Sequence, residues 1–187
     1  KKTKCIVYRQ RQLSAVGHAI GNIMSKPVTD YINNVLREKR QEFGGRAVCP
    51  FAGPELDSNK LMIGEVGDKS LIELIRDFDN SDFESALFII KDDISSDQTK
   101  KFQRFVNKLL KEEKLTDYKS ICFNPNDQVS VEGYNPRARA PHFMINIAHK
   151  KVLSKANKSL KKTNYYDKLP KEYLSFLELS MKNKNTD

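Results

Sequence analysis

The spacing of apolar residues predicts most of the helices of this chain. Apolar residues recur at steps of three and four between Val28 and Leu36, which predicts an amphipathic helix from Pro27 to a stop at Gly44-Gly45. The same spacing predicts four further helices: one through Leu71–Phe78 capped by Asp68, one through Phe102–Leu110 behind a capping box of Ser95 and Gln98, and two closing helices, Lys151–Lys161 and Pro170–Met181.

Shorter apolar runs predict four strands, Leu61–Val66, Ala86–Ile90, Tyr118–Phe123 and Phe143–Ile147. Ala86–Ile90 is apolar on both alternating faces, which is typical of a central strand covered on both sides. The order of elements predicts an α+β fold, a single domain with a mixed sheet of about four strands and helices packed on it. A chain of 187 residues with 39% hydrophobic residues is long enough for one such core.

The two ends of the chain differ from this pattern. Residues 1–23 hold five of the 33 basic residues and no acidic residue, so the body is only mildly basic although the net charge is +9. Three interpretations of 1–23 stay open: a cloning-derived or upstream-translated extension, a flexible basic arm, or a targeting segment, which the His and Gly residues disfavour. We expect one domain over residues 24–181, followed by a polar tail, 182–187.

Cysteine content and hydropathy bear on the location of the protein. The three cysteines, Cys5, Cys49 and Cys122, show neither disulfide-rich nor metal-knuckle spacing, which favours a reducing, cytoplasmic compartment and predicts no metal site. The longest apolar stretch, Ala86–Ile90, is far below the roughly 18 residues of a membrane span, so no membrane partner is expected. The common phosphate-loop, dinucleotide, zinc-protease and serine-hydrolase motifs do not occur.

The segment Arg46–Pro54 contains the first candidate site. Two prolines and a glycine predict an ordered turn rather than a helix. A cation at Arg46 would lower the pKa of the Cys49 thiol and make it a nucleophile or a metal or haem ligand, with Phe51 in the pocket wall. The alternative is that Cys49 is a small buried hydrophobic residue.

The second candidate site is the loop Asn135–His142, which two prolines stiffen. Arg137 and Arg139 suit bidentate recognition of carboxylate or phosphate, so the loop predicts an anion site in which Asn135 takes part. By strand alternation His142 shares a face with Met144 and Asn146, and that polar face would complete the site. The alternative is an exposed loop whose arginines are solvated or pair with Glu132 and Asp127.

Asn124 and a run of lysines after the last strand each have both a functional and a structural interpretation. Asn124 ends the third strand, where it would shape a pocket or form a plain Asx turn. His149 is expected on the opposite face of the last strand, next to the start of a helix. Six lysines followed by Tyr165 and Tyr166 would form an RNA-binding face or a solvated helix surface: Lys150, Lys151, Lys155, Lys158, Lys161 and Lys162.

Three segments carry a family resemblance over roughly residues 27–160: Val48-Cys49-Pro50-Phe51-Ala52, Phe123-Asn124-Pro125, and Asn135 to Arg139-Ala140-Pro141. In this order they resemble a bacterial family with a domain of unknown function, whose members share Leu-Cys-Pro-Phe-Ala, Phe-His-Pro and Asn-Arg-Ser-Pro. Asn124 stands where that pattern has His, and Phe143 where it has a second proline. Cys49-Pro50-Phe51 is also similar to the YqcI/YcgG proteins, which include haem-dependent enzymes that oxidise nitrogen in amino-acid-like substrates.

Three hypotheses for function follow. The first is an enzyme acting on a small anionic metabolite, with Cys49 and His142 as catalytic residues, and with the resemblance implying haem as its cofactor. Its anion would bind to Arg46, Asn135, Arg137 and Arg139, and Phe51 and Asn124 would line the pocket. The second is a non-catalytic domain that binds a small ligand in the same pocket, and the third is an RNA-binding protein. The first two predict that Cys49 lies close to the Asn135–His142 loop.

Overall fold

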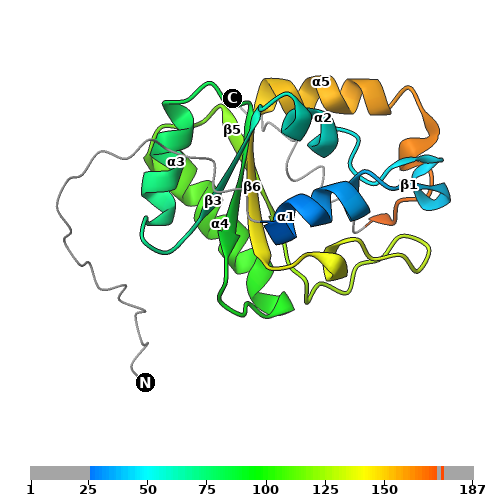
Figure 1. The fold of residues 1–187 in the computed structure, drawn as a ribbon, viewed down its shortest axis with the longest axis horizontal. Helices are drawn as coiled ribbons and strands as arrows, with labels where there is room; N and C mark the ends of the chain where they lie inside the picture. Colours follow the sequence, from blue (N-terminus) through cyan, green and yellow to red (C-terminus); the bar gives the residue numbers. More distant parts are fainter. Residues whose placement is uncertain (1–25, 172–173, 175–187) are drawn as a thin grey trace, which may run out of the picture.

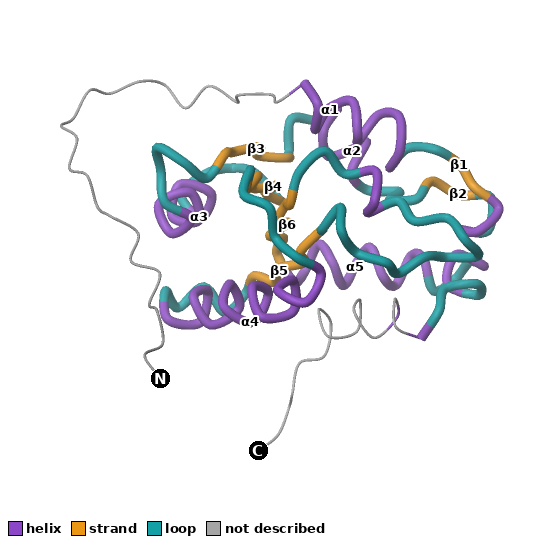
Figure 2. Tube along the Cα trace, turned by 90° about the horizontal axis from the view of Figure 1, so that it is seen from below, coloured by secondary structure: helices purple, strands orange, loops and turns teal. Residues whose placement is uncertain are grey.

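A four-stranded mixed sheet lies between two layers of helices in the computed structural model, which describes residues 26–171 and 174 (Figures 1 and 2). The strand order is β3 (Leu61–Glu65), β4 (Ser85–Ile90), β6 (Phe143–His149), β5 (Tyr118–Phe123). β3 is parallel to β4, and β6 is antiparallel to both of its neighbours. The predicted α+β fold is therefore confirmed.

β4 has the central position that its sequence predicts. All six of its residues are buried, and it pairs with β3 on one side and β6 on the other. The parallel connection from β3 to β4 runs through α3 (Leu71–Asp79), as parallel neighbours require a crossover.

α3 and α4 (Ser96–Glu112) cover one face of the sheet, where they pack on the odd-numbered residues of β6 and the even-numbered residues of β4. The capping box of Ser95 and Gln98 is present as predicted. The cap predicted at Asp68 is wrong, because Ser70 caps α3 in a capping box with Glu73. Phe105, expected in the buried stripe of α4, is 54% exposed.

The opposite face is covered by α1 (Lys26–Tyr31) with its π-helical continuation Ile32–Leu36, by α2 (Ala52–Asp57) and by α5 (Lys150–Leu160). The helix predicted up to Gly44 ends at Leu36, which corrects that boundary. A charged segment follows the helix. In it, β1 (Lys39–Arg40) pairs antiparallel with β2 (Arg46–Ala47), and the 3-10 turn Gln41–Phe43 lies between them. Gly44 ends this turn at φ 64° rather than ending the first helix.

α2 corrects the prediction that the segment up to Pro54 excludes a helix. Pro54 is the third residue of α2, where the missing N–H has no intrahelical partner to lose. Gly53 is needed for packing, since a Cβ atom there would lie 2.7 Å from Nε of Arg37. A short helix therefore begins directly after Cys49-Pro50-Phe51.

Several sequence predictions lie outside the described residues. These are the extension 1–23, the tail 182–187 and most of the second closing helix, of which Pro170, Lys171 and Leu174 are described. α5 and the 3-10 turn Asn164–Tyr166 precede that region. Across the described part of the chain, no helix combines the length and apolar character needed to cross a lipid bilayer.

Candidate functional site

A cavity of about 200 Å³ lies between the sheet and the layer formed by α1, α2 and α5. Leu87 of β4 and Asn146 and Ala148 of β6 contribute to its floor. The alternation predicted for the last strand is confirmed, because Met144 belongs to this side of the sheet while Phe143, Ile145 and Ile147 belong to the other. The rest of the wall is mostly apolar, with Ile32, Leu36, Phe51, Phe123, Leu153 and Ala156 among its residues.

Two long-range hydrogen bonds hold the wall of the cavity. The Tyr31 hydroxyl donates to the carbonyl oxygen of Pro136 at 3.0 Å, and the Tyr165 hydroxyl donates to the carbonyl oxygen of Val48 at 2.5 Å. Both bonds are buried, so they join α1 to the loop after β5, and the C-terminal turn to the segment before α2. The cavity is therefore fixed by residues that are far apart in the sequence.

Cys49 lies in this wall, directly before α2, and its amide N–H donates to the carbonyl oxygen of Leu36 at 2.8 Å. Burial raises the pKa of the Cys49 thiol, although hydrogen bonds from the backbone N–H groups of Phe51 and Ala52 oppose the rise, and the charge of Glu55 adds to it. Arg46, the cation expected beside the thiol, is an exposed residue of β2 and does not line the cavity. The thiol is therefore protonated at neutral pH.

Part of the Asn135–His142 loop reaches the same cavity, as predicted for Cys49 and this loop. Pro136 and Arg137 are among its lining residues, as is Cys49. Oδ1 of Asn135 accepts from the backbone N–H groups of Arg137 and Ala138, at 3.0 and 3.2 Å, and so shapes the 3-10 turn Arg137–Arg139. The side chain of Arg137 is 3% exposed and forms an ion pair with Asp127 at 2.6 Å.

The other proposed site residues lie elsewhere. Arg139 is outside the cavity, 3.6 Å from Glu38 and 3.4 Å from the Tyr134 hydroxyl. His142 does not belong to the described lining of the cavity, so the structure does not pair it with Cys49. His149 caps α5, where its Nδ1 accepts from the N–H of Lys151 at 3.3 Å, as its predicted position implied.

Asn124 has a structural environment rather than a place in the pocket wall. It is fully buried, and its Nδ2 donates to Thr99 Oγ1 at 2.7 Å and to the carbonyl oxygens of Ile94 and Ser95. Its Oδ1 accepts from the N–H of Asn126, which is the Asx turn that the sequence offered as the alternative. The Nδ2 group therefore joins the end of β5 to the start of α4, and Oδ1 closes the turn after β5.

Sequence reasoning missed Glu55 and Ser85, which line the cavity at the end of the sheet where β4 begins. The Ser85 hydroxyl donates to Oε2 of Glu55 at 2.6 Å. Burial raises the pKa of the Glu55 carboxyl, the hydrogen bond from Ser85 opposes this, and the nearby charge of Glu84 adds to it. A glutamate in a short helix gives no sequence signal of this kind, whereas Asn146 is visible as a polar residue inside an apolar strand.

The cavity does not suit either of the groups that the sequence hypotheses would place in it, a metal ion or haem. Among residues 26–171 and 174, no group of three His, Cys, Asp or Glu side chains could hold a metal ion. A cavity of about 200 Å³ is smaller than the roughly 300–1,000 Å³ of pockets for drug-sized ligands, and a porphyrin is larger than those ligands. The cavity and its lining residues therefore do not fit haem.

Comparisons with known proteins add no relative to this geometry. The chain matches no protein-family model, no curated protein sequence and no solved structure, so the resemblance described above rests on its three motifs alone.

Proposed function

We propose that the protein binds a small, largely apolar organic molecule in the cavity between the sheet and α1, α2 and α5. The observation that carries the proposal is an apolar cavity with a few polar groups converging on it from different elements, namely Glu55, Ser85, Asn146 and Arg137. Enclosed apolar pockets with a small number of placed polar groups are typical of ligand sites.

The volume of the cavity limits the size of the ligand. An engineered apolar cavity of roughly 150 Å³ takes up benzene. A cavity of about 200 Å³ is therefore suited to a molecule of one ring with a short substituent.

Binding is better supported than the catalytic hypothesis built on Cys49 and His142. The Cys49 thiol has a raised pKa, and the titratable group that influences it is the carboxyl of Glu55 rather than an imidazole. A thiol nucleophile needs a neighbouring base or a lowered pKa. The pKa of the Cys49 thiol is raised, and among the described residues no base forms a hydrogen bond with the thiol.

An anionic ligand also has limited support from the arginines. Arg137 already pairs with Asp127, and Arg139 with Glu38, so an added anion would have to compete with these carboxylates. Glu55, the one acidic residue among the described lining residues of the cavity, would repel an anion.

A cavity-filling substitution tests the proposed site. In Ala156→Phe a ring would occupy the space beside α5, and Ala138→Phe is the matched control because Ala138 is exposed. Ligand-observed NMR with a panel of one-ring compounds should show binding to the wild type and to Ala138→Phe, and its loss in Ala156→Phe. Equal binding by all three proteins would place the ligand elsewhere, and no binding to the wild type would contradict the proposal.

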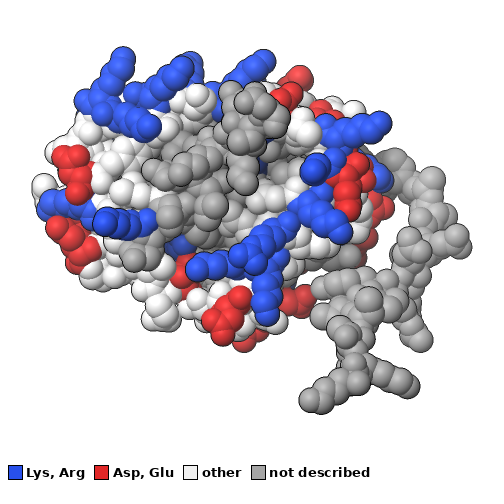
Figure 3. Space-filling view, turned by 180° about the vertical axis from the view of Figure 1, so that it is seen from behind, with Lys and Arg blue, Asp and Glu red and all other residues white. Residues whose placement is uncertain are grey.

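A second candidate function rests on the outer face of α5. Lys151, Lys155 and Lys158 of α5 and Lys162 just after it recur at helical spacing, and all four are exposed. No acidic residue occurs from residue 133 to 166. Basic side chains gather along the upper edge of the molecule in Figure 3. Within the described residues these lysines have no ion-pair partner. Such a stripe is suited to the phosphates of a single RNA strand.

The salt dependence of RNA binding tests this candidate. Glutamine at these four positions should reduce the slope of log affinity against log salt by about three, since each phosphate contact on a single strand contributes about 0.7. Glutamine at Lys100, Lys101, Lys108 and Lys111 of α4 is the control, because acidic residues accompany those exposed lysines. An equal loss in both variants would point to net charge rather than to a binding face.

A further inference from the structure

The carboxyl of Glu55 lines an apolar cavity without a basic partner. Among the described residues, its one side-chain hydrogen bond comes from Ser85, and no Lys, Arg or His forms an ion pair with it. Two basic side chains in this region are engaged elsewhere: Lys60 with Glu84 and the carbonyl oxygen of Asp82, and Arg37 with Asp57 and the carbonyl oxygen of Gly53. A carboxylate away from water is costly unless a cation or several hydrogen-bond donors reach it.

Asn146 provides a second acceptor on the same floor. Its Nδ2 donates to the carbonyl oxygen of Ala86 at 3.1 Å, and because a carbonyl can only accept, this bond fixes the orientation of the amide. Among the described residues, this bond from Nδ2 is the one hydrogen bond of the Asn146 side chain, so Oδ1 accepts from none of them. The strand register pairs Asn146 with Leu87 and Ala148 with Ser85, so Asn146 lies diagonally across from Ser85 on the cavity face.

From this arrangement we infer that the ligand of the cavity is a small apolar amine, whose ammonium group donates hydrogen bonds to Glu55 and Asn146 while its ring lies on the apolar wall. The inference rests on the proposed function and names the ligand class. An ammonium group supplies three hydrogen-bond donors and one positive charge. The donors match the acceptors on Asn146 and Glu55, and the charge matches the Glu55 carboxylate, which has no basic partner among the described residues. The apolar remainder of the ligand would contact Phe51, Phe123 and Ala156.

A matched set of probes separates charge from shape. Phenethylamine, 2-phenylethanol and 3-phenylpropionate share a ring and a two-carbon chain, and they differ in carrying an ammonium, a hydroxyl or a carboxylate group. Calorimetry at pH 8 should show that the wild type binds the amine at least tenfold more tightly than the alcohol, and does not measurably bind the carboxylate. A tenfold ratio is what one charge-assisted hydrogen bond contributes.

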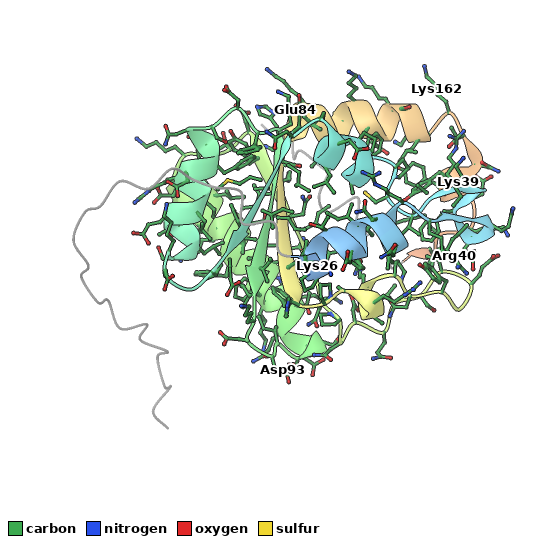
Figure 4. All side chains as sticks on the ribbon, viewed as in Figure 1. Lys26, Lys39, Arg40, Glu84, Asp93 and Lys162 are labelled. Atoms are coloured by element: carbon green, nitrogen blue, oxygen red, sulfur yellow. The ribbon has the colours of Figure 1, made fainter. Side chains whose placement is uncertain are left out.

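Substitution of the carboxyl tests its role. Glu55→Gln keeps the shape and an acceptor for Ser85, so it should remove the preference for the amine while leaving the affinity for the alcohol within twofold. Glu84→Gln is the control, because Glu84 is an exposed carboxyl beside Ser85 at the start of β4 that does not line the cavity (Figure 4). It should retain the preference for the amine.

A pH series on the wild type gives a test that does not depend on a variant. The groups around the Glu55 carboxyl are the Cys49 thiol before α2, Glu84 and Ser85 at β4, and Arg137 and Tyr166 elsewhere in the cavity wall. Acidification from pH 8 to pH 4 neutralises Glu55 but not an alkylamine. The affinity for phenethylamine should therefore fall, while the affinity for 2-phenylethanol should stay level.

The outcomes distinguish this inference from the proposed function. If the alcohol or the carboxylate binds as tightly as the amine, or if Glu55→Gln keeps the preference, the amine inference is wrong and the cavity remains a ligand site. If none of the three probes binds and the one-ring panel also shows no binding, both are overturned.

Discussion

The hydroxyl of Tyr31 on α1 donates to the carbonyl oxygen of Pro136, which is 105 residues further along the chain and 3.0 Å away. Tyr31→Phe removes this buried bond and leaves the carbonyl without that donor, so we expect the free energy of unfolding to fall by about 0.5–1.5 kcal/mol. Urea denaturation measures the change. Tyr118→Phe is the control, because its bond to Asp79 is exposed, and a smaller loss is expected. Equal losses would contradict the assigned role of the Tyr31 bond.

Arg137 and Arg139 should differ sharply when each is replaced by Ala. Arg137→Ala leaves Asp127 as a nearly buried carboxylate without its partner, which should cost about 3–5 kcal/mol. Arg139 is 51% exposed and 3.6 Å from Glu38, so Arg139→Ala should cost less than about 1 kcal/mol. Thermal and urea unfolding of both variants would measure this. If Arg139→Ala instead abolished binding of a carboxylate or phosphate ligand, the anion hypothesis from the sequence would regain support.

Asn124→Ala should destabilise the fold without changing ligand binding. The substitution removes donors to Ile94, Ser95 and Thr99 from a fully buried site, which we expect to cost about 2–4 kcal/mol. Calorimetric melting and the NMR panel would be run on the same protein. A stable variant that has lost the ligand would instead assign Asn124 to the site.

Glu55 should make the stability of the protein depend on pH in a defined direction. Its pKa is raised in the folded state, so folding is favoured where the group is protonated in both states and is disfavoured as the pH rises through the folded pKa. Glu55→Gln should therefore be more stable than the wild type at pH 8, and the difference should vanish below pH 4. Urea midpoints across this range check it, and a wild type that is more stable at pH 8 would contradict the sign.

The thiols should react slowly with Ellman's reagent. Burial raises the pKa of Cys49 and raises that of Cys122 to about 12, so few thiolate anions are present at pH 7. In a Cys5→Ser background, both remaining thiols should react far more slowly than in the same protein unfolded in guanidinium. A fast reaction that disappears in Cys49→Ser would show an activated thiol, in support of the catalytic hypothesis.

The fold was predicted well where local patterns decide it. The strand Tyr118–Phe123 was predicted with its exact bounds, and β4 was recognised as central because both of its faces are apolar. The bounds of helices were predicted wrongly where tertiary contacts override local sequence signals. The first helix stops at Leu36 because the following charged residues turn into β1, and α2 tolerates Pro54 because it falls in the first turn.

The candidate site was predicted in part. The Arg46–Pro54 segment and the Asn135–His142 loop both contribute to one cavity, since Cys49 and Arg137 are among its lining residues. The pairing of Arg137 with Asp127 was one of two interpretations of the loop, and the sequence could not decide between them. It gave no sign that a carboxyl from a short helix would accept a hydrogen bond from Ser85, thirty residues later. Both depend on burial and on long-range geometry, for which a single sequence contains no periodic signal.

The hydrogen bond from Tyr165 to Val48 has a consequence for synthesis of the protein on the ribosome. The two residues are 117 positions apart. Tyr165 belongs to the same apolar cluster as Val28 and Ile32, so the apolar inner side of the first helix is not fully covered until nearly all of the described chain has emerged. At roughly 5–20 residues per second, synthesis of these 117 residues leaves the nascent chain exposed for about 6–23 seconds. Products of premature termination would keep that surface open, and we expect chaperones and proteases to recognise them.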